Sequence, residues 1–244
     1  METIKLLGIR FHKLTRQQLF QVITQSLKTE RKIIIAHVNI HALNLAYELD
    51  WYRDFLNRAD FVFCDGFGVV LGAKLMGHII KAEHRLTCPD WIEELALFCQ
   101  QHNLSLFLLG GKPGVAEEAA TKLKMAAPGL RIATQHGYFQ KTSAENDQVV
   151  AQINAFKPHI LYVGLGMPFQ EEWIQTNINQ VEAKIFMPLG ACIDYYTGRI
   201  YRGPRWLTDY GLEWLCRLLF EPKRLWRRYL IGGPLFLYRL LHSD

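Results

Sequence analysis

The residue in this 244-residue chain best placed to do chemistry is Asp65. It follows the short apolar run 60–64 (DFVFC) and precedes Gly66. A carboxylate at the end of a strand can act as a general base towards a substrate hydroxyl. The alternative is that Asp65 caps the helix that follows, because Asp is a favoured N-cap residue. Its position alone leaves both interpretations open.

A glycine-rich junction at 110–114 (GGKPG) is a candidate phosphate site. It follows an apolar strand and opens a helix, so backbone N–H groups at Gly110 and Gly111 can hold a phosphate. The motif is neither GxGxxG nor a P-loop. A plain tight turn is the alternative interpretation.

A second strand-to-helix junction spans 164–171 (GLGMPFQE). Pro168 suits the start of a helix. Gln170 then lies in the first turn, where its amide can reach a sugar hydroxyl. Alternatively, Gln170 and Glu171 only cap the helix.

Three further side chains are candidate ligand contacts. Asn39 follows an apolar strand and either binds a polar ligand or caps a helix. Arg85 can balance diphosphate charge, although a solvated surface arginine is the ordinary alternative. Tyr138, within HGYF (136–139), offers a ring for a nucleobase or fills the core.

Apolar strand-like runs alternate with amphipathic helical ones along most of the chain. Continuous apolar strands are buried on both faces, and strand–helix alternation indicates an α/β fold with a mainly parallel sheet. Ligands bind such sheets beyond the carboxyl ends of the strands, where most of the residues above fall. The predicted strands are 32–38, 60–64, 104–109, 130–134, 159–163 and 184–189, and the predicted helices are 39–49, 67–76, 89–101, 113–125, 143–156 and 169–179.

The C-terminal fifth of the chain differs from the rest in charge. Residues 199–244 hold nine Lys or Arg and four Asp or Glu, which accounts for the whole net charge of +5. The same stretch is rich in Trp, Leu and Tyr, a composition typical of segments that lie on anionic membranes. We therefore divide the chain into a catalytic core, 1–198, and a basic amphipathic appendage, 199–244.

The segment 222–231 (PKRLWRRYLI) predicts an amphipathic helix within this appendage. Pro222 suits its first turn, and Gly232-Gly233-Pro234 is expected to end it. The alternative to membrane contact is a helix packed on the core with a solvated basic face. At 100° per residue the basic face holds Lys223, Arg224, Arg227 and Arg228, and the apolar face holds Leu225, Trp226, Tyr229 and Leu230.

Several classes of protein are disfavoured. The charged N-terminus is unlike a signal peptide, and no run of about 18 apolar residues predicts a membrane-spanning helix. The five cysteines lack CxxC spacing and are expected to be reduced thiols of a cytosolic protein. No clustered metal-ligand spacing occurs, so no metal or other cofactor is expected. A neutral core argues against nucleic-acid binding, and the absence of GxGxxG after the first strand argues against a nucleotide-dependent oxidoreductase.

Taken together, the motifs resemble the WecG/TagA/CpsF family of bacterial glycosyltransferases. The resemblance runs from about Leu6 to Tyr229. It rests on the blocks DGFGVV (65–70), RLTCPDW (85–91), LLGGKPGVAEEAATKL (108–123), HGYF (136–139), GMPFQEEW (166–173), GACIDYYTGRIYRGPRW (190–206) and GLEWLCRLLFEPKRLWRRYL (211–230).

The resemblance implies an inverting, metal-independent transfer from a UDP-sugar to a sugar on a polyprenyl diphosphate. It also implies a Rossmann-like core and an appendage that holds the protein peripherally on the inner face of the cytoplasmic membrane. Asp65 matches the base. The other matching residues are Asn39, Arg85 and Gln170 in the sugar pocket, Gly110, Gly111 and Tyr138 on the nucleotide side, Asp194 as a further substrate contact, and Arg217, Arg224 and Arg227 near the diphosphates and lipid headgroups.

Four positions depart from the family pattern. His37, Cys88, Phe169 and Gly203 stand where Thr, Gly, a basic residue and Ala are more usual. The first three fall near the expected sugar pocket, so the sugars stay open among N-acetylmannosamine, its uronic acid and glucose. A non-catalytic membrane-associated scaffold is the alternative function. A homo-oligomer is possible, because Trp206, Tyr210 and Trp214 recur every four residues and can face the core, a partner subunit or lipid.

Overall fold

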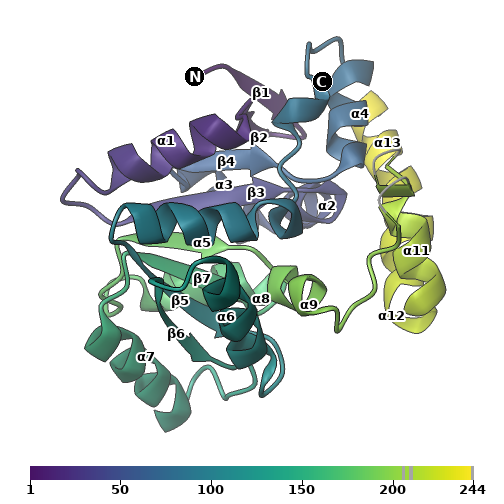
Figure 1. Ribbon diagram of the computed structural model, residues 1–244. Helices are drawn as coiled ribbons and strands as arrows, with labels where there is room; N and C mark the ends of the chain where they lie inside the picture. The colour runs from purple at the N-terminus through teal and green to yellow at the C-terminus, as the bar shows by residue number, and fades with distance from the viewer. Residues whose placement is uncertain (205–206, 209–210, 243–244) are drawn as a thin grey trace.

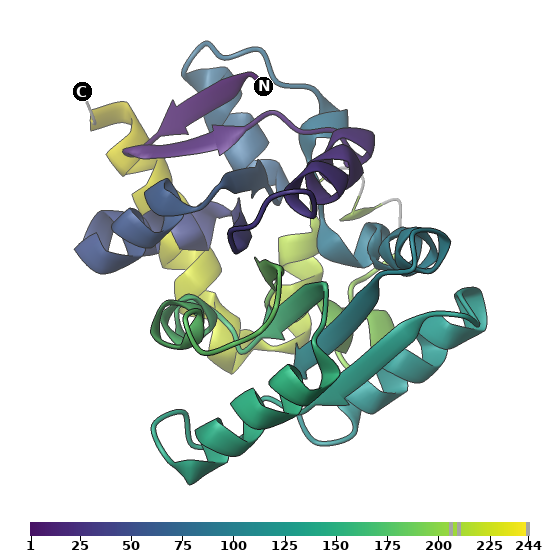
Figure 2. The ribbon, with the colours of Figure 1, turned by 90° about the vertical axis from the view of Figure 1, so that its left-hand side faces the viewer.

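A computed structural model of the protein describes residues 1–204, 207–208 and 211–242 (Figure 1). Its centre is an eight-stranded sheet in the order β1-β2-β4-β3-β8-β7-β5-β6. All neighbouring strands run parallel except β1 and β2, which form an antiparallel hairpin at one edge, purple in Figure 2. The strands are β1 (Thr3–Leu6), β2 (Ile9–His12), β3 (Ile33–Val38), β4 (Phe61–Cys64), β5 (Ser105–Gly110), β6 (Arg131–Gln135), β7 (Ile160–Gly164) and β8 (Ile185–Pro188).

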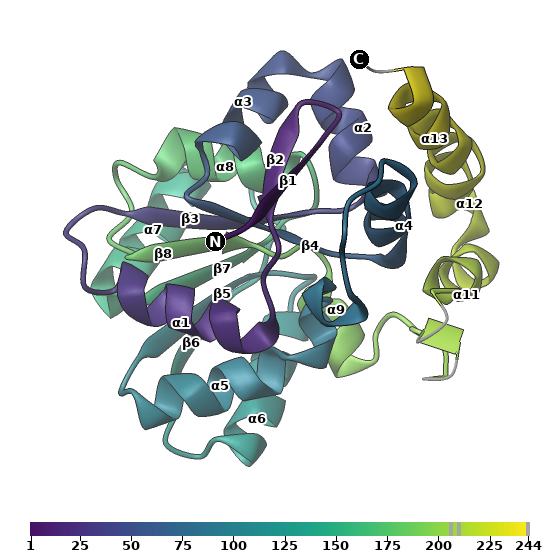
Figure 3. The same cartoon turned by 90° about the horizontal axis from the view of Figure 1, so that it is seen from above.

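Helices cover both faces of this sheet and enclose two hydrophobic cores, as the view from above shows (Figure 3). One core lies under α1 (Arg16–Ser26), α5 (Ile92–Gln101), α6 (Val115–Ala126) and the short α9 (Cys192–Thr197). The other lies under α2 (Ile40–Glu48), α3 (Asp50–Arg58), α4 (Phe67–Leu75), α7 (Ala144–Phe156) and α8 (Phe169–Asn177). Two 3₁₀ turns, η1 (Ala82–His84) and η2 (Cys88–Asp90), connect α4 to α5.

This architecture confirms the predicted α/β fold with a mainly parallel sheet flanked by helices. The six predicted strands correspond to β3–β8, with ends that differ by one residue or so. The N-terminal hairpin was not predicted. Its strands are only four residues long, and their alternation of buried Ile4 and Leu6 with exposed Thr3 and Lys5 is brief. So short a pattern carries little periodic signal.

The C-terminal segment forms a helical column beside the carboxyl edge of the sheet (Figures 1 and 3). It consists of α11 (Glu213–Phe220), α12 (Pro222–Trp226), the π-helical turn η3 (Arg227–Ile231) and α13 (Gly232–His242). The prediction that Pro222 begins a helix is confirmed. The prediction that Gly232-Gly233-Pro234 ends it is wrong, because α13 continues through these residues. Pro234 lies in the first turn of α13, where a missing N–H is tolerated.

The side chains of this segment that face the core are not those predicted. Leu225 is buried, but Trp226 and Leu230 of the predicted apolar face are exposed, and Arg228 of the predicted basic face points inward and is half-buried. The predicted division into two faces is therefore wrong. At 100° per residue Arg228 lies only about 60° from Leu225, whereas Trp226 and Leu230 lie about 100° and 140° from it. Trp206 and Tyr210 lie outside the described residues, so the predicted aromatic stripe is not traced.

Helix α13 joins the column to α2 and α4. Phe236 packs so closely over Gly72 of α4 that a Cβ at Gly72 would lie 2.7 Å from the ring. The Asn44 amide donates to the Gly232 carbonyl at 2.8 Å, and the Arg239 guanidinium donates to Glu48 at 2.7 Å. These contacts fix the column beside the residues that follow β3 and β4.

One expectation about the cysteines is wrong. Cys88 and Cys192 form a disulfide, with Cα atoms 5.8 Å apart, which ties η2 to α9. The two residues are 104 positions apart, so only the fold brings them to the spacing that a disulfide spans. Cys64, Cys99 and Cys216 are free and buried. Within the described ranges, every helix is too short or too polar to cross a membrane.

Candidate active site

The candidate site lies where the carboxyl ends of β3, β4 and β8 meet. The order of the strands reverses here. From β3 the chain adds β4 on one side, and it then adds β5 to β8 on the other side. Ligands of open α/β sheets bind at such a switch point. The backbone N–H of Asp65 donates to the Val38 carbonyl at 2.8 Å, and that of Leu86 donates to Cys64 at 2.8 Å. The segments that carry Asn39, Asp65 and Arg85 are thereby held side by side.

Asp65 does not cap a helix. The N-cap of α4 is Gly66, whose φ of +98° suits glycine, and no side chain caps that helix. The Asp65 carboxylate is 24% exposed, so a substrate can reach it. Its nearest ionisable partner is His37, whose Nε2 lies 3.7 Å from Asp65 Oδ2. The geometry thus favours the general-base interpretation over the capping one.

His37 is the last residue but one of β3 and is buried. Its Nδ1 lies 2.8 Å from the Pro188 carbonyl at the end of β8. Burial lowers the pKa of His37, while the Asp65 carboxylate and the Pro188 carbonyl oppose that shift. The contact with Pro188 of β8 therefore orients the His37 ring so that its Nε2 faces Asp65. The sequence marked His37 only as a departure from the family pattern.

Asn39 caps α2, since its side-chain oxygen accepts from the Ala42 N–H at 3.0 Å. The capping alternative is confirmed, and the Asn39 Cβ lies 3.9 Å from the place that a Cβ on Gly66 would occupy. Arg85 pairs its backbone with Cys64 and donates from its guanidinium to the Thr208 carbonyl at 3.2 Å. Arg85 thus links the core site to the chain that enters the appendage.

Gln170 is fully buried, so it lies beneath the site rather than on its surface. Its oxygen accepts from the Gly190 N–H at 2.9 Å, and its amide donates to Glu171 at 2.8 Å. Neither residue caps α8. Burial raises the pKa of Glu171 to about 7. Gln170 thus holds Gly190 in the loop between β8 and α9, the helix that carries Asp194.

The predicted nucleotide-side residues come together at the ends of β5 and β6. The Gly137 N–H donates to the Gly111 carbonyl at 2.9 Å, which places exposed Tyr138 beside the 110–114 loop. A Cβ on Gly110 would lie 2.6 Å from the Gly164 carbonyl, so only glycine allows these strand ends to pack. The loop leads into α6 at Val115.

Asp194 of α9 lies between the glycine loop and the appendage. Burial raises the pKa of Asp194, and the charges of Arg224 and Lys112 oppose that shift. Arg224 is exposed and pairs with Glu221. Arg227 is exposed, with its guanidinium 5.3 Å from the Trp226 ring centre. Both arginines are exposed, and Arg224 is the one whose charge acts on Asp194.

Arg217 and Arg228 instead face the core. The Arg217 guanidinium lies 4.8 Å from the Tyr195 ring centre, and its Nε is buried with no hydrogen-bond partner among the described residues. Both guanidinium charges interact with the Asp65 carboxylate. Arg228 also acts on His41, where burial and this charge lower the pKa to about 4. Sequence reasoning missed the inward position of Arg228, because the predicted basic face grouped it with Arg227.

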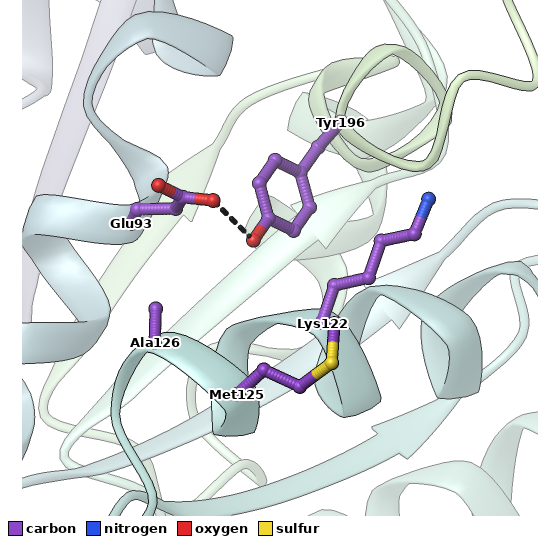
Figure 4. A pocket seen from close by; sticks show the side chains of 5 residues that line it. All are labelled: Glu93, Lys122, Met125, Ala126 and Tyr196. Atoms are coloured by element: carbon purple, nitrogen blue, oxygen red, sulfur yellow. Dashed lines mark hydrogen bonds between the residues drawn. The ribbon is translucent and has the colours of Figure 1, made fainter.

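A separate surface depression lies between α5, α6 and α9 (Figure 4). In it the Tyr196 hydroxyl donates to Glu93 at 2.8 Å. Lys122 of the same depression pairs with Glu118 at 3.2 Å and donates to the Thr197 carbonyl. The charged and hydroxyl groups of these side chains therefore all have protein partners. None of the predicted site residues lines the depression.

Within the described ranges, no three His, Cys, Asp or Glu side chains lie close enough together to hold a metal ion. The site therefore consists of a carboxylate with a buried histidine, two inward guanidinium groups and a glycine loop. Such a site suits proton abstraction beside a departing anionic group.

A parallel α/β sheet with an acid–base site at its switch point is the architecture of many group-transfer enzymes. A sequence profile described as "Glycosyl transferase WecG/TagA/CpsF family" matches residues 4–244. The chain belongs to this family of glycosyltransferases, as its motifs indicated.

Curated relatives agree with the profile. Proteins of Staphylococcus aureus strains MRSA252 and NCTC 8325 / PS 47 are each 30% identical to the chain over 247 aligned positions. Each alignment covers 97% of this chain and 91% of the relative. Both relatives are named N-acetylglucosaminyldiphosphoundecaprenol N-acetyl-beta-D-mannosaminyltransferase.

Proposed function

We propose that the protein transfers a sugar from a UDP-sugar to a polyprenyl diphosphate-linked sugar, with Asp65 as the base. The position of Asp65 carries the proposal. It is a partly exposed carboxylate at the switch point, it caps no helix, and its charge and those of Arg217 and Arg228 act on one another. The names of the relatives support N-acetylmannosamine as the transferred sugar and N-acetylglucosamine as the acceptor sugar.

In this reaction Asp65 takes the proton of the acceptor hydroxyl as the oxygen attacks the anomeric carbon. The bond from that carbon to the UDP oxygen breaks, and the electron pair leaves with UDP. Attack from the face opposite UDP inverts the anomeric configuration. Arg217, Arg228 and the N–H groups of the 110–114 loop are suited to stabilise the departing diphosphate. The transfer then needs no metal ion.

The appendage suits contact with an anionic membrane at the cytoplasmic face. Arg224 and Arg227 are exposed on it, near exposed apolar side chains of the same column. Cationic and apolar groups together favour binding at the headgroup level. A peripheral position there would bring the diphosphate of a lipid-linked acceptor to the site. The exposed apolar side chains include Leu219, Phe220, Trp226, Leu230, Ile231 and Tyr238.

A donor panel tests this function. Purified protein is incubated with a short-chain polyprenyl diphosphate-linked N-acetylglucosamine and single UDP-sugars, with EDTA present throughout. We expect product from the N-acetylmannosamine donor, with the anomeric configuration inverted. If no donor gives product either with or without EDTA, while the protein is folded and liposomes are supplied, the transferase proposal is wrong and a scaffold role gains support. Product only without EDTA would refute metal independence alone.

A further inference from the structure

The contact between His37 and Asp65 has a consequence for how the site handles the proton. The Pro188 carbonyl can only accept a hydrogen bond, so the proton of a neutral His37 ring must lie on Nδ1. The other ring nitrogen, Nε2, then presents a lone pair to Asp65 Oδ2 at 3.7 Å. His37 Nε2 and Asp65 Oδ2 are then both acceptors, so one added proton is needed before they can form a hydrogen bond.

The surroundings of His37 keep it neutral before the reaction. The charged groups that face it are Asp65 after β4 and Arg228 from the appendage. From β8 it meets the Pro188 carbonyl, and from β4 the Phe63 ring stacks at 5.7 Å. Burial and the positive charge of Arg228 both oppose a second proton on the ring. A proton on Asp65 changes this balance, because the two facing atoms, 3.7 Å apart, can then move together into a hydrogen bond.

We propose that His37 is a positioning residue that relays the proton which Asp65 takes from the acceptor hydroxyl. The inference rests on the proposed function, since it needs Asp65 to be the base. The acceptor O–H bond breaks and the proton joins Asp65, while the hydroxyl oxygen bonds to the anomeric carbon and UDP leaves with its electron pair. The proton then passes from Asp65 Oδ2 to His37 Nε2. This regenerates the carboxylate, and the imidazolium forms an ion pair with it.

The relay makes a specific prediction for the acid limb of the pH–rate profile, which is the range of low pH over which the transfer rate falls. In the wild type, a proton on Asp65 blocks the base and a proton on His37 blocks the relay, so the acid limb reports the proton affinity of the pair. His37→Asn keeps an amide N–H near the Nδ1 position for Pro188 but cannot take a proton. Its acid limb should move to lower pH, by about one unit for a strongly coupled pair. Its plateau rate should also fall, on the order of tenfold, because the relay is lost.

Single-turnover transfer rates between pH 4.5 and 9 test this, with circular dichroism as a check of folding. The control is His159→Asn. His159 also has a hydrogen-bonded Nδ1 and a pKa lowered by burial, but it precedes β7 and so lies at the amino ends of the strands, away from the site at their carboxyl ends. We expect no movement of its acid limb. If His37→Asn does not fold, His37→Gln is measured instead, since its amide is equally unable to accept a proton.

The outcomes separate the two proposals. A limb that moves to lower pH with a lower plateau supports the relay. A lower plateau with an unmoved limb means that His37 only packs, and it overturns the relay, as does an unchanged profile. An inactive wild type, or an Asp65→Asn variant as active as the wild type, overturns the proposed function instead.

Discussion

The appendage should complete the site only while α13 is docked, and Phe236→Ala tests this. Phe236 is 1% exposed and covers Gly72 so closely that a Cβ there would lie 2.7 Å from its ring. Removing such a ring costs about 3–5 kcal/mol in a packed core. At about 1.4 kcal/mol per tenfold, docking of the column should weaken by roughly two to four orders of magnitude.

Hydrogen exchange followed by mass spectrometry measures docking directly. Peptides from residues 213–242 should lose protection in Phe236→Ala, while β5, β7 and β8 stay protected. Transfer should fall with the docked fraction, because Arg217 and Arg228 leave the neighbourhood of Asp65. The control is Leu241→Ala, since Leu241 is on the same helix but 68% exposed. Full activity in a Phe236→Ala protein with an unprotected column would refute the role of the appendage.

Three further predictions concern Arg228, Glu171 and Gly110. Arg228→Met should lower single-turnover transfer by roughly a hundredfold, because it removes a charge beside the reacting groups. The control is Lys223→Met, on the exposed side of α12. Equal transfer rates in the two variants would exclude a role of Arg228 in the reaction. Because the pKa of Glu171 is raised from 4.5 to about 7, the native state binds its proton more tightly than the unfolded state. Stability should therefore fall as pH rises from 4.5 to about 7. In a plot of thermal midpoint against pH, Glu171→Gln should flatten the curve over this range. Parallel curves for the variant and the wild type would contradict the raised pKa of Glu171. Gly110→Ala should lower the free energy of unfolding in urea by about 1–3 kcal/mol, since a Cβ would lie 2.6 Å from the Gly164 carbonyl. An unchanged free energy of unfolding would show that the ends of β5 and β7 can separate.

Local sequence patterns predicted those parts of the site that depend on one strand and the turn after it. Asp65 follows an apolar strand, and the 110–114 loop follows another, so their place at the carboxyl edge could be inferred. The partnership of His37 with Pro188 could not, because it depends on β3 lying next to β8, which are about 150 residues apart. The Cys88–Cys192 disulfide was missed for the same reason.

The appendage shows a different limit. Its basic and aromatic composition indicated a surface role, and the helix start at Pro222 was predictable. The orientation of each arginine was not predicted, because the division into two faces followed residue type, and Arg228 lies only about 60° from buried Leu225 at 100° per residue. Arg227 lies about 160° from Leu225 on the same projection and is exposed, so the fate of the two neighbours depends on which sector of the helix meets the core.

The most direct test of the central claim compares wild type and Asp65→Asn in single-turnover transfer from the UDP-sugar to the lipid-linked acceptor. Asn keeps the size of the side chain but cannot accept the hydroxyl proton. With Asp65 as the base, the rate should fall by about 10²- to 10⁴-fold while the thermal midpoint stays within a few degrees of the wild type. A rate within threefold of the wild type, in a folded protein, would contradict the account.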